Sequence, residues 1–179
     1  EEEMLNIFSN SNFDKLAEQN ASYSTTIDTE YLPRLKEACV KVLEPVKAQF
    51  KFYVDLQGMN TIEGNLETKV SFICQRCGKE YTQTLKASFL STCDEEKAKS
   101  LQIEDKVDVV ELNEDGTFNL LSFLEDCLLL EIPFITTHEE GSKECQEVDN
   151  LEFGKIEKSN EDNPFSQLAA LKEQLKQNK

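Results

Sequence analysis

The sequence predicts an α+β fold, in which an antiparallel sheet of about four or more strands packs against helices and a C-terminal amphipathic helix follows. Two periodicities support this prediction. Apolar and polar residues alternate between residues 46 and 92, as is typical of half-buried strands, whereas apolar residues recur at helical spacing in residues 29–44, 119–132 and 163–175. A chain of 179 residues is long enough for one well-cored domain with extensions.

We expect three parts along the chain. Residues 1–28 form an N-terminal extension, residues 29–153 a single α+β domain that contains a Cys-x-x-Cys hairpin, and residues 154–179 a charged linker with the C-terminal helix. The boundaries follow from where the apolar periodicity begins and ends.

The first predicted helix spans residues 29–44. Asp28 or Thr29 can cap its start, and Pro45 follows its end. The apolar residues at helical spacing are Tyr31, Leu35, Ala38, Cys39 and Val42.

Three antiparallel strands are expected between Val46 and Thr92. Turn signals at residues 58–60 and 64–65 would lie in the first connection, and Cys77-Gly78-Lys79 in the second. The alternating residues that identify the strands are Phe50, Phe52 and Val54, then Val70, Phe72 and Cys74, and then Tyr81 and Leu85.

The remaining predicted elements are a strand and two helices. Lys106 to Leu112 predicts a short strand that ends at the turn signal of residues 113–116, and a buried helix follows from Asn119 and stops before Pro133. After an acidic, non-periodic stretch, Asn163 and Pro164 can start the terminal helix. Its apolar stripe is Phe165, Leu168, Leu171 and Leu175.

The charge distribution and the start of the sequence indicate which ligands and which cellular compartment to expect. The net charge is −16, and residues 93–162 hold 21 of the 35 acidic residues but 6 of the 19 basic ones. This excess disfavours nucleic acid as a direct ligand and indicates either a need for solubility or a surface for a basic partner. The acidic start at residues 1–3 is unlike a secretory signal, and the apolar run 127–135 is too short to span a bilayer. We therefore expect a cytoplasmic protein without a membrane segment.

The sharpest local motif is Cys74-Gln75-Arg76-Cys77-Gly78. Two cysteines at this spacing can bind one zinc ion, and the glycine permits the tight turn between them. A structural site needs four ligands, and the candidates for the rest are Cys145 with either His138 or Cys93. Zinc is thus a possible cofactor, and the alternative is a turn whose thiols are structural only.

Nothing in the sequence points to catalysis. His138 is the only histidine, so any mechanism that needs an imidazole base would depend on it, and no nucleophile motif lies nearby. No glycine-rich phosphate-binding motif is present. We expect a protein that is not an enzyme.

Two groups of residues are candidates for contacting partners. A basic stretch consisting of Arg34, Lys36, Lys41, Lys47 and Lys51 is the one place where RNA phosphate could be met, and its alternative is a solvated surface. Arg76 and Lys79 flank the cysteine turn and could extend that surface. The terminal stripe of residues 165–175 could dock on the domain itself or enter the groove of a partner.

Four segments, in this order and spacing, resemble the YceD family of large ribosomal RNA subunit accumulation proteins. Together they cover roughly residues 35 to 175. The segments are Cys74-Gln75-Arg76-Cys77-Gly78-Lys79; Val110-Glu111-Leu112-Asn113 with Gly116 and Asn119-Leu120; Glu125-Asp126 through Leu128-Leu129-Leu130 to Ile132-Pro133; and Asn163-Pro164-Phe165 with Leu168-Ala169-Ala170-Leu171-Lys172.

The resemblance implies a cytoplasmic factor that supports accumulation of 23S ribosomal RNA. Together with the acidic excess of residues 93–162, the resemblance makes a basic ribosomal protein or a large-subunit precursor the expected partner, and ribosomal RNA itself is the alternative. The resemblance supplies no catalytic residues.

Overall fold

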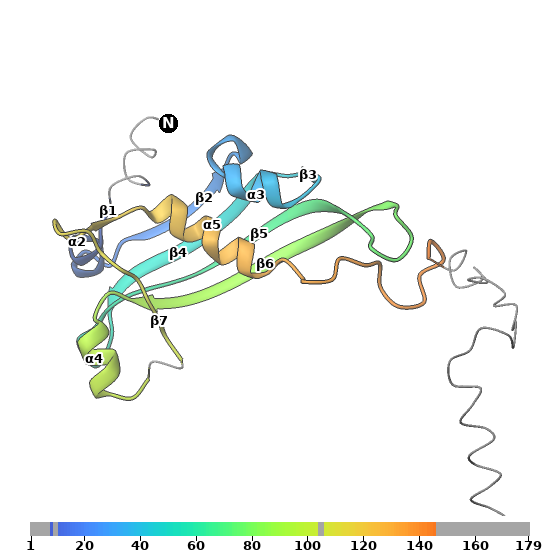
Figure 1. Ribbon diagram of the computed structural model, residues 1–179. Coiled ribbons are helices and arrows are strands. Elements are labelled where there is room, and N and C mark those ends of the chain that lie inside the picture. The colour runs from blue at the N-terminus through green and yellow to red at the C-terminus, as the bar shows by residue number, and fades with distance from the viewer. Residues whose placement is uncertain (1–7, 9–10, 104–105, 146–179) are drawn as a thin grey trace, which may run out of the picture.

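The computed structural model describes Phe8, residues 11–103 and residues 106–145, and it shows a mixed α+β protein (Figure 1). A mostly antiparallel six-stranded sheet has the order β2-β4-β5-β6-β7, and β3 pairs with β5 beyond the end of β4. The strands are β2 (Ser22–Ile27), β3 (Lys41–Val42), β4 (Val46–Val54), β5 (Asn60–Ile73), β6 (Glu80–Thr92) and β7 (Asp108–Val109). The predicted fold class is confirmed.

Four described helices and a small two-stranded ladder complete the fold. The helices are α2 (Phe13–Glu18), α3 (Pro33–Ala38), α4 (Glu95–Ser100) and α5 (Leu120–Leu130), with a 3-10 turn η1 (Thr29–Tyr31) before α3. The ladder pairs β1 (Ser11–Asn12) with β8 (Thr117–Phe118). No helix in these described ranges has the length and the apolar character needed to cross a membrane.

The β5–β6 hairpin is the longest feature of the sheet. Its thirteen cross-strand pairs run from Thr61 opposite Thr92 to Ile73 opposite Glu80. Figure 1 shows its closed end projecting beyond α3 and α5. The predicted turn at Cys77-Gly78-Lys79 closes this hairpin, as expected.

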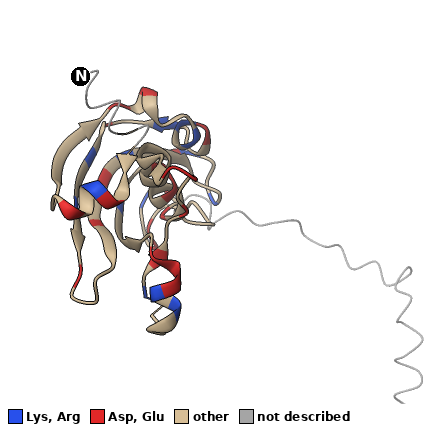
Figure 2. Ribbon diagram, turned by 90° about the vertical axis from the view of Figure 1, so that its left-hand side faces the viewer, with Lys and Arg blue, Asp and Glu red and all other residues tan. Residues whose placement is uncertain are grey.

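The two faces of the sheet differ. Alternate residues of β4, β5 and β6 are buried, and the residues between them are exposed and mostly polar. Cross-strand ion pairs join lysines and glutamates on the exposed face, as in Lys51 with Glu63 and Lys86 with Glu67. Acidic and basic residues are mixed along the drawn ribbon, without a large region that is only basic (Figure 2).

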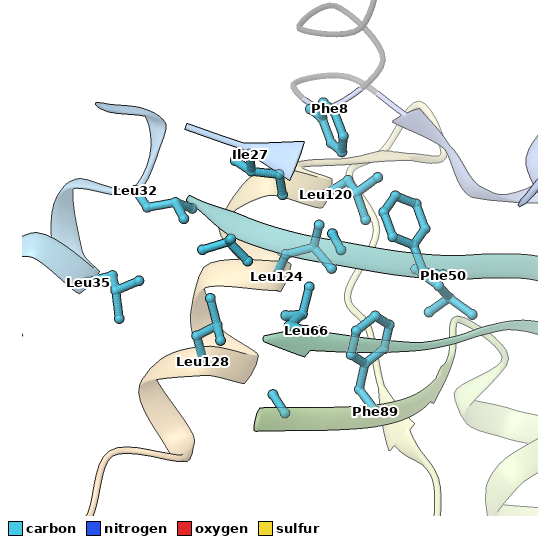
Figure 3. Close-up of a cluster of buried hydrophobic side chains, with 14 of the residues drawn as sticks. Phe8, Ile27, Leu32, Leu35, Phe50, Leu66, Phe89, Leu120, Leu124 and Leu128 are labelled. Atoms are coloured by element: carbon cyan, nitrogen blue, oxygen red, sulfur yellow. The ribbon is translucent and has the colours of Figure 1, made fainter. Parts of the chain in front are cut away.

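Helix α5 covers the buried face. Asn119 caps its start by accepting a hydrogen bond from the Ser122 N–H at 2.9 Å. Leu120, Leu124 and Leu128 lie one helical turn apart and point at the sheet (Figure 3). They belong to the same buried cluster as Phe50, Leu66 and Phe89 of the sheet. The predicted buried helix before Pro133 is therefore confirmed.

The predicted helix over residues 29–44 is wrong beyond Ala38. Cys39 is extended, with φ −120° and ψ 165°. The Val40 N–H donates to the Ser71 carbonyl at 3.0 Å, and Val42 pairs with Val70. β-branched valines favour strand pairing, and here the neighbouring edge of β5 was available to pair with them.

Two smaller predictions also need correction. Gly64-Asn65 is not a turn, because both residues lie inside β5, opposite Phe50 and Gln49 of β4. The strand expected over residues 106–112 consists of only two residues, β7, and it pairs in parallel with the end of β6.

Residues before the expected domain boundary at residue 28 share the core of the domain. Strand β2 pairs with β4 along its whole length, and Phe13 of α2 is fully buried against Phe52 and Phe118. The linker and terminal helix expected over residues 154–179 lie outside the described residues, as does the apolar stripe of residues 165–175.

Candidate metal centre

The closed end of the β5–β6 hairpin is built as a tight turn that aims two thiols at the same point. The Cys74 N–H donates to the Lys79 carbonyl at 2.9 Å, and the Gly78 N–H donates to the Cys74 carbonyl at 2.8 Å. Gly78 has φ +72°, a left-handed conformation that glycine adopts without a steric penalty. The sequence Cys-x-x-Cys-Gly therefore folds here for a local backbone reason.

The chain after α5 returns to this turn. The Gln75 N–H donates to the Thr136 carbonyl at 2.8 Å, and the Thr136 hydroxyl donates to the Ile73 carbonyl at 2.9 Å. These two bonds fix residues 133–145 against the hairpin end. Figure 1 shows this segment, in orange, running from α5 toward the closed end.

Four candidate ligand atoms meet where the segment crosses the hairpin. The ligand atoms of Cys74, Cys77, His138 and Cys145 all lie within 4.8 Å of one another. The Cys74 and Cys145 sulfurs are 3.7 Å apart, and His138 Nδ1 is 3.5 Å from the Cys77 sulfur and 3.2 Å from the Cys145 sulfur.

These separations suit a tetrahedral zinc site. Zinc bonds of about 2.3 Å to sulfur and about 2.1 Å to nitrogen place two sulfurs about 3.8 Å apart and a sulfur and a nitrogen about 3.6 Å apart. Three cysteines and one histidine are also a ligand set found in structural zinc sites. The cluster could therefore bind a metal ion such as zinc.

His138 is held in place from two sides. Its ring lies 4.9 Å from the ring of Tyr81, and its Nε2 lies 2.6 Å from Glu144 Oε2, although Nε2 lacks the alignment of a hydrogen bond. A ligating histidine usually directs its second nitrogen at a carboxylate, which fixes the tautomer. No signal in the sequence marks Tyr81, Thr136 and Glu144 as supports of the cluster, because the fold alone makes them its neighbours.

The thiols of the cluster do not titrate alike. Burial raises the pKa of Cys74, but N–H groups of Cys77 and His138 and the His138 side chain outweigh burial and lower that pKa to about 5. Burial and the neighbouring sulfurs of Cys74 and Cys77 raise the pKa of Cys145 to about 11. The shell thus favours a first thiolate and resists a second, because like charges repel at this distance. A divalent cation would remove that repulsion.

Cys93, the alternative ligand, lies elsewhere. It follows the opposite end of β6, and its sulfur is 3.8 Å from Asp14 Oδ1. Thirteen residues of strand separate it from the hairpin end, a span of roughly 40 Å. The structure brings together the set with His138 and not the set with Cys93.

We predict that Cys93 resists alkylation in the folded protein. Burial, followed by the nearby charges of Asp94 and Asp14, raises its pKa to about 12. Because only the thiolate reacts, iodoacetamide at pH 8 should modify Cys93 on the order of 1,000-fold more slowly than in the urea-unfolded chain. Mass spectrometry of the Cys93 peptide measures both rates, and equal rates would contradict this prediction.

The basic residues predicted to contact RNA differ in their surroundings: some form ion pairs within the domain and others are exposed. Arg34 binds within the domain: its Nε donates to Glu125 Oε2 at 2.9 Å, and its Nη1 donates to Asp126 Oδ1 at 2.5 Å. Lys51 pairs with Glu63 and lies over the ring of Tyr53. Lys36, Lys41 and Lys47 are exposed. At the hairpin end, Arg76 and Lys79, predicted to contact a partner, are also exposed.

A family model described as Large ribosomal RNA subunit accumulation protein YceD matches residues 62–172. The chain belongs to the YceD family. The matched range includes the β5–β6 hairpin from Ile62 onward, α5 and all four clustered ligands. The resemblance read from the sequence is thereby confirmed.

A named relative agrees with this assignment. The large ribosomal RNA subunit accumulation protein YceD of Haemophilus influenzae is 30% identical over 162 residues, which cover 89% of this chain and 92% of that protein. No solved structure matches the chain. The family name implies a role in accumulation of large-subunit ribosomal RNA.

Proposed function

We propose that this chain is a non-enzymatic, cytoplasmic factor that supports production of the large ribosomal subunit by binding a basic ribosomal protein or a subunit precursor. Membership of the YceD family is the observation that carries the proposal. The net charge of −16 supports it, because ribosomal proteins are basic and an acidic surface attracts them.

Affinity purification tests this proposal. The tagged protein, recovered from lysate at moderate salt, should carry large-subunit proteins or precursor particles, identified by mass spectrometry. A tagged protein of similar size and net charge from outside the family is the control for nonspecific attraction. Recovery of metabolic enzymes alone, without ribosomal proteins, would contradict the proposal.

We propose further that the cluster of Cys74, Cys77, His138 and Cys145 holds zinc as a structural ion. The observations in favour are the fitting distances and the tight turn at Gly78. Zinc there would join the hairpin end to residues 133–145 and so fix the surface that both present. Elemental analysis of protein purified without a histidine tag should give about one zinc per chain, and less than a tenth would contradict this.

A second candidate function is direct binding of ribosomal RNA. The exposure of Lys36, Lys41 and Lys47 favours it, since no ion pair reaches these lysines from any other described residue. A salt titration with ribosomal RNA fragments separates the candidates, because phosphate contacts weaken steeply as salt rises. No binding at low salt would exclude this second function.

Arg34 allows a prediction about that basic stretch. Glu125 is 4% exposed, and besides Arg34 it accepts the Leu35 N–H at 3.0 Å. Arg34→Ala would leave this buried carboxylate without its cation, at a cost of about 2 kcal/mol in unfolding free energy, reduced from a fully buried pair because Arg34 is half exposed.

Urea denaturation measures that cost, and Lys36→Ala on the same helix is the matched control. The control should change stability little, because Lys36 is exposed. If Arg34→Ala were as stable as the control but weaker in RNA binding, Arg34 would be an RNA contact instead of a link between α3 and α5.

A further inference from the structure

One long edge of the sheet has no partner strand within the described part of the chain. Strand β6 pairs with β5 on one side, whereas on the other side β7 pairs only with Ser91 and Thr92. Residues 80–89 therefore form an open edge, which Figure 1 shows along the lower border of the sheet. Ten residues of strand extend over about 34 Å.

The pattern of the ladder shows which backbone groups point outward. The Cys74 N–H donates to the Lys79 carbonyl toward β5, whereas the Thr92 carbonyl accepts the Val110 N–H on the opposite side. Since the direction alternates along a strand, the even-numbered residues from 80 to 88 direct their N–H and C=O groups away from β5. No other described residue hydrogen-bonds to these groups.

A hollow of about 930 Å³ follows the start of this edge. Four consecutive residues, 80–83, line it together with residues 137–140 and 142–144. Since consecutive side chains of a strand point to opposite faces, the hollow runs along the edge rather than over one face. Its lining is acidic: it contains Glu80, Glu139, Glu140 and Glu144 but a single lysine, Lys143.

We propose that an extended basic segment of a partner protein adds as a strand to the open edge of β6, with its lysines or arginines meeting the glutamates of the hollow. Unpaired strand backbone is a template for another strand, and side-chain charge then selects which strand binds. This inference rests on the proposed function and names the place where a basic ribosomal protein would bind.

Charge complementarity favours this occupant over two others. Residues 146–179 of the same chain hold seven acidic and five basic residues, so they carry no net positive charge to match the hollow. A second copy of the chain, paired edge to edge through β6, would present a strand with a single basic residue, Lys86. A basic segment from another protein has neither disadvantage.

Binding of a model peptide tests the strand addition. The probe is a fluorescently labelled ten-residue peptide in which arginine alternates with threonine, and its control has proline in place of threonine at equal charge. Proline cannot supply the ladder hydrogen bonds or the strand conformation. Fluorescence anisotropy should show the control binding at least tenfold more weakly, and equal affinities would overturn the proposal.

Variants of the protein separate backbone from charge. Thr82→Pro removes an N–H that points outward and leaves every hydrogen bond to β5 in place. It should lower the affinity for the probe peptide at least tenfold, whereas Thr82→Val should leave the affinity unchanged. A triple variant that neutralises the hollow should also lower the affinity for the probe peptide at least tenfold. Its substitutions are Glu80→Gln, Glu139→Gln and Glu140→Gln. The matched control, Glu95→Gln with Glu96→Gln and Glu114→Gln, loses the same charge elsewhere and should stay within twofold.

Hydrogen exchange in the unaltered protein tests strand addition without any variant, so its result does not depend on whether Thr82→Pro folds. On addition of the probe, exchange of the Thr82, Thr84 and Lys86 amides should slow, whereas the Gln83 and Leu85 amides, which already bond to β5, should change little. Uniform or absent slowing would mean that the probe is held by charge alone or binds elsewhere, which overturns strand addition.

The same variants distinguish failure of this inference from failure of the proposed function. If the unaltered protein recovers large-subunit proteins from lysate and Thr82→Pro recovers them equally, the partner binds elsewhere and only this inference fails. If the unaltered protein recovers none, the proposed function itself fails.

Discussion

Removal of zinc is expected to release residues 133–145 from the hairpin end while the sheet remains folded. Two hydrogen bonds of Thr136, to Gln75 and Ile73, and the four-ligand cluster hold this segment in place. When the free zinc concentration is 100 times the dissociation constant, zinc binding stabilises the bound form by about 2.7 kcal/mol. Chelation should therefore speed amide exchange at Gln75 and Cys145 about 100-fold.

Controls for zinc removal lie elsewhere in the chain. The amides of Phe50 and Leu66, in the middle of the sheet, should keep their exchange rates during chelation. Cys145→Ser should lower zinc content and release the segment, whereas Cys127→Ser, the same change on α5, should do neither. Loss of the whole sheet on chelation, or an unaltered segment, would contradict a local structural role for the ion.

Gly64→Ala is expected to destabilise the domain by about 3 kcal/mol. Gly64 lies inside β5 on the buried face, between Phe50 and Phe89 on the neighbouring strands. An added Cβ would lie 2.5 Å from the Cβ of Phe50, 2.6 Å from the Gln49 carbonyl oxygen and 2.7 Å from the ring of Phe89. Two of these contacts involve a backbone oxygen and a Cβ atom, which cannot rotate away, so the strand itself must shift. Overpacking of this kind can lower the unfolding free energy by about 3 kcal/mol.

Urea denaturation of Gly64→Ala measures that cost against Asn65→Ala, the adjacent change on the exposed face. Asn65 is exposed, and its side chain accepts one exposed hydrogen bond, from the Ser88 hydroxyl, so this change should alter the unfolding free energy by less than about 0.5 kcal/mol. An equal effect of the two substitutions would show that Gly64 is not a point of close strand approach.

The strands could be predicted because their alternation has a direct physical cause. Phe50 and Phe52 in β4, and Val70 and Phe72 in β5, alternate because one sheet face packs under α5 and the other faces water. The α5 boundaries were also accessible, since Asn119 is a cap and Pro133 ends the apolar run. Local signals of this kind act within a few residues.

Elements whose conformation depends on distant partners could not be predicted. Val42 lies at helical spacing from Ala38 and Cys39, but it pairs with Val70 of β5 and so belongs to the sheet. Gly64 reads as a turn signal, although its role is to let two phenylalanines approach its strand. Arg34 reads as a free cation until α5 places Glu125 and Asp126 beside it.

The metal ligands were intermediate between these cases. Cys74 and Cys77 could be predicted as a pair because their spacing and Gly78 form one local turn. Cys145 was the third candidate, but the fourth ligand remained open between His138 and Cys93, since 61 residues separate His138 from Cys77. The fold decided this by directing the chain after α5 across the hairpin end through Thr136.

The level of 23S ribosomal RNA in cells that lack this protein tests the central claim most directly. We expect a lower ratio of 23S to 16S RNA in such cells, restored by the unaltered chain and by the Cys127→Ser control, but poorly by Cys145→Ser. An unchanged ratio in cells lacking the protein would contradict a role in accumulation of 23S ribosomal RNA.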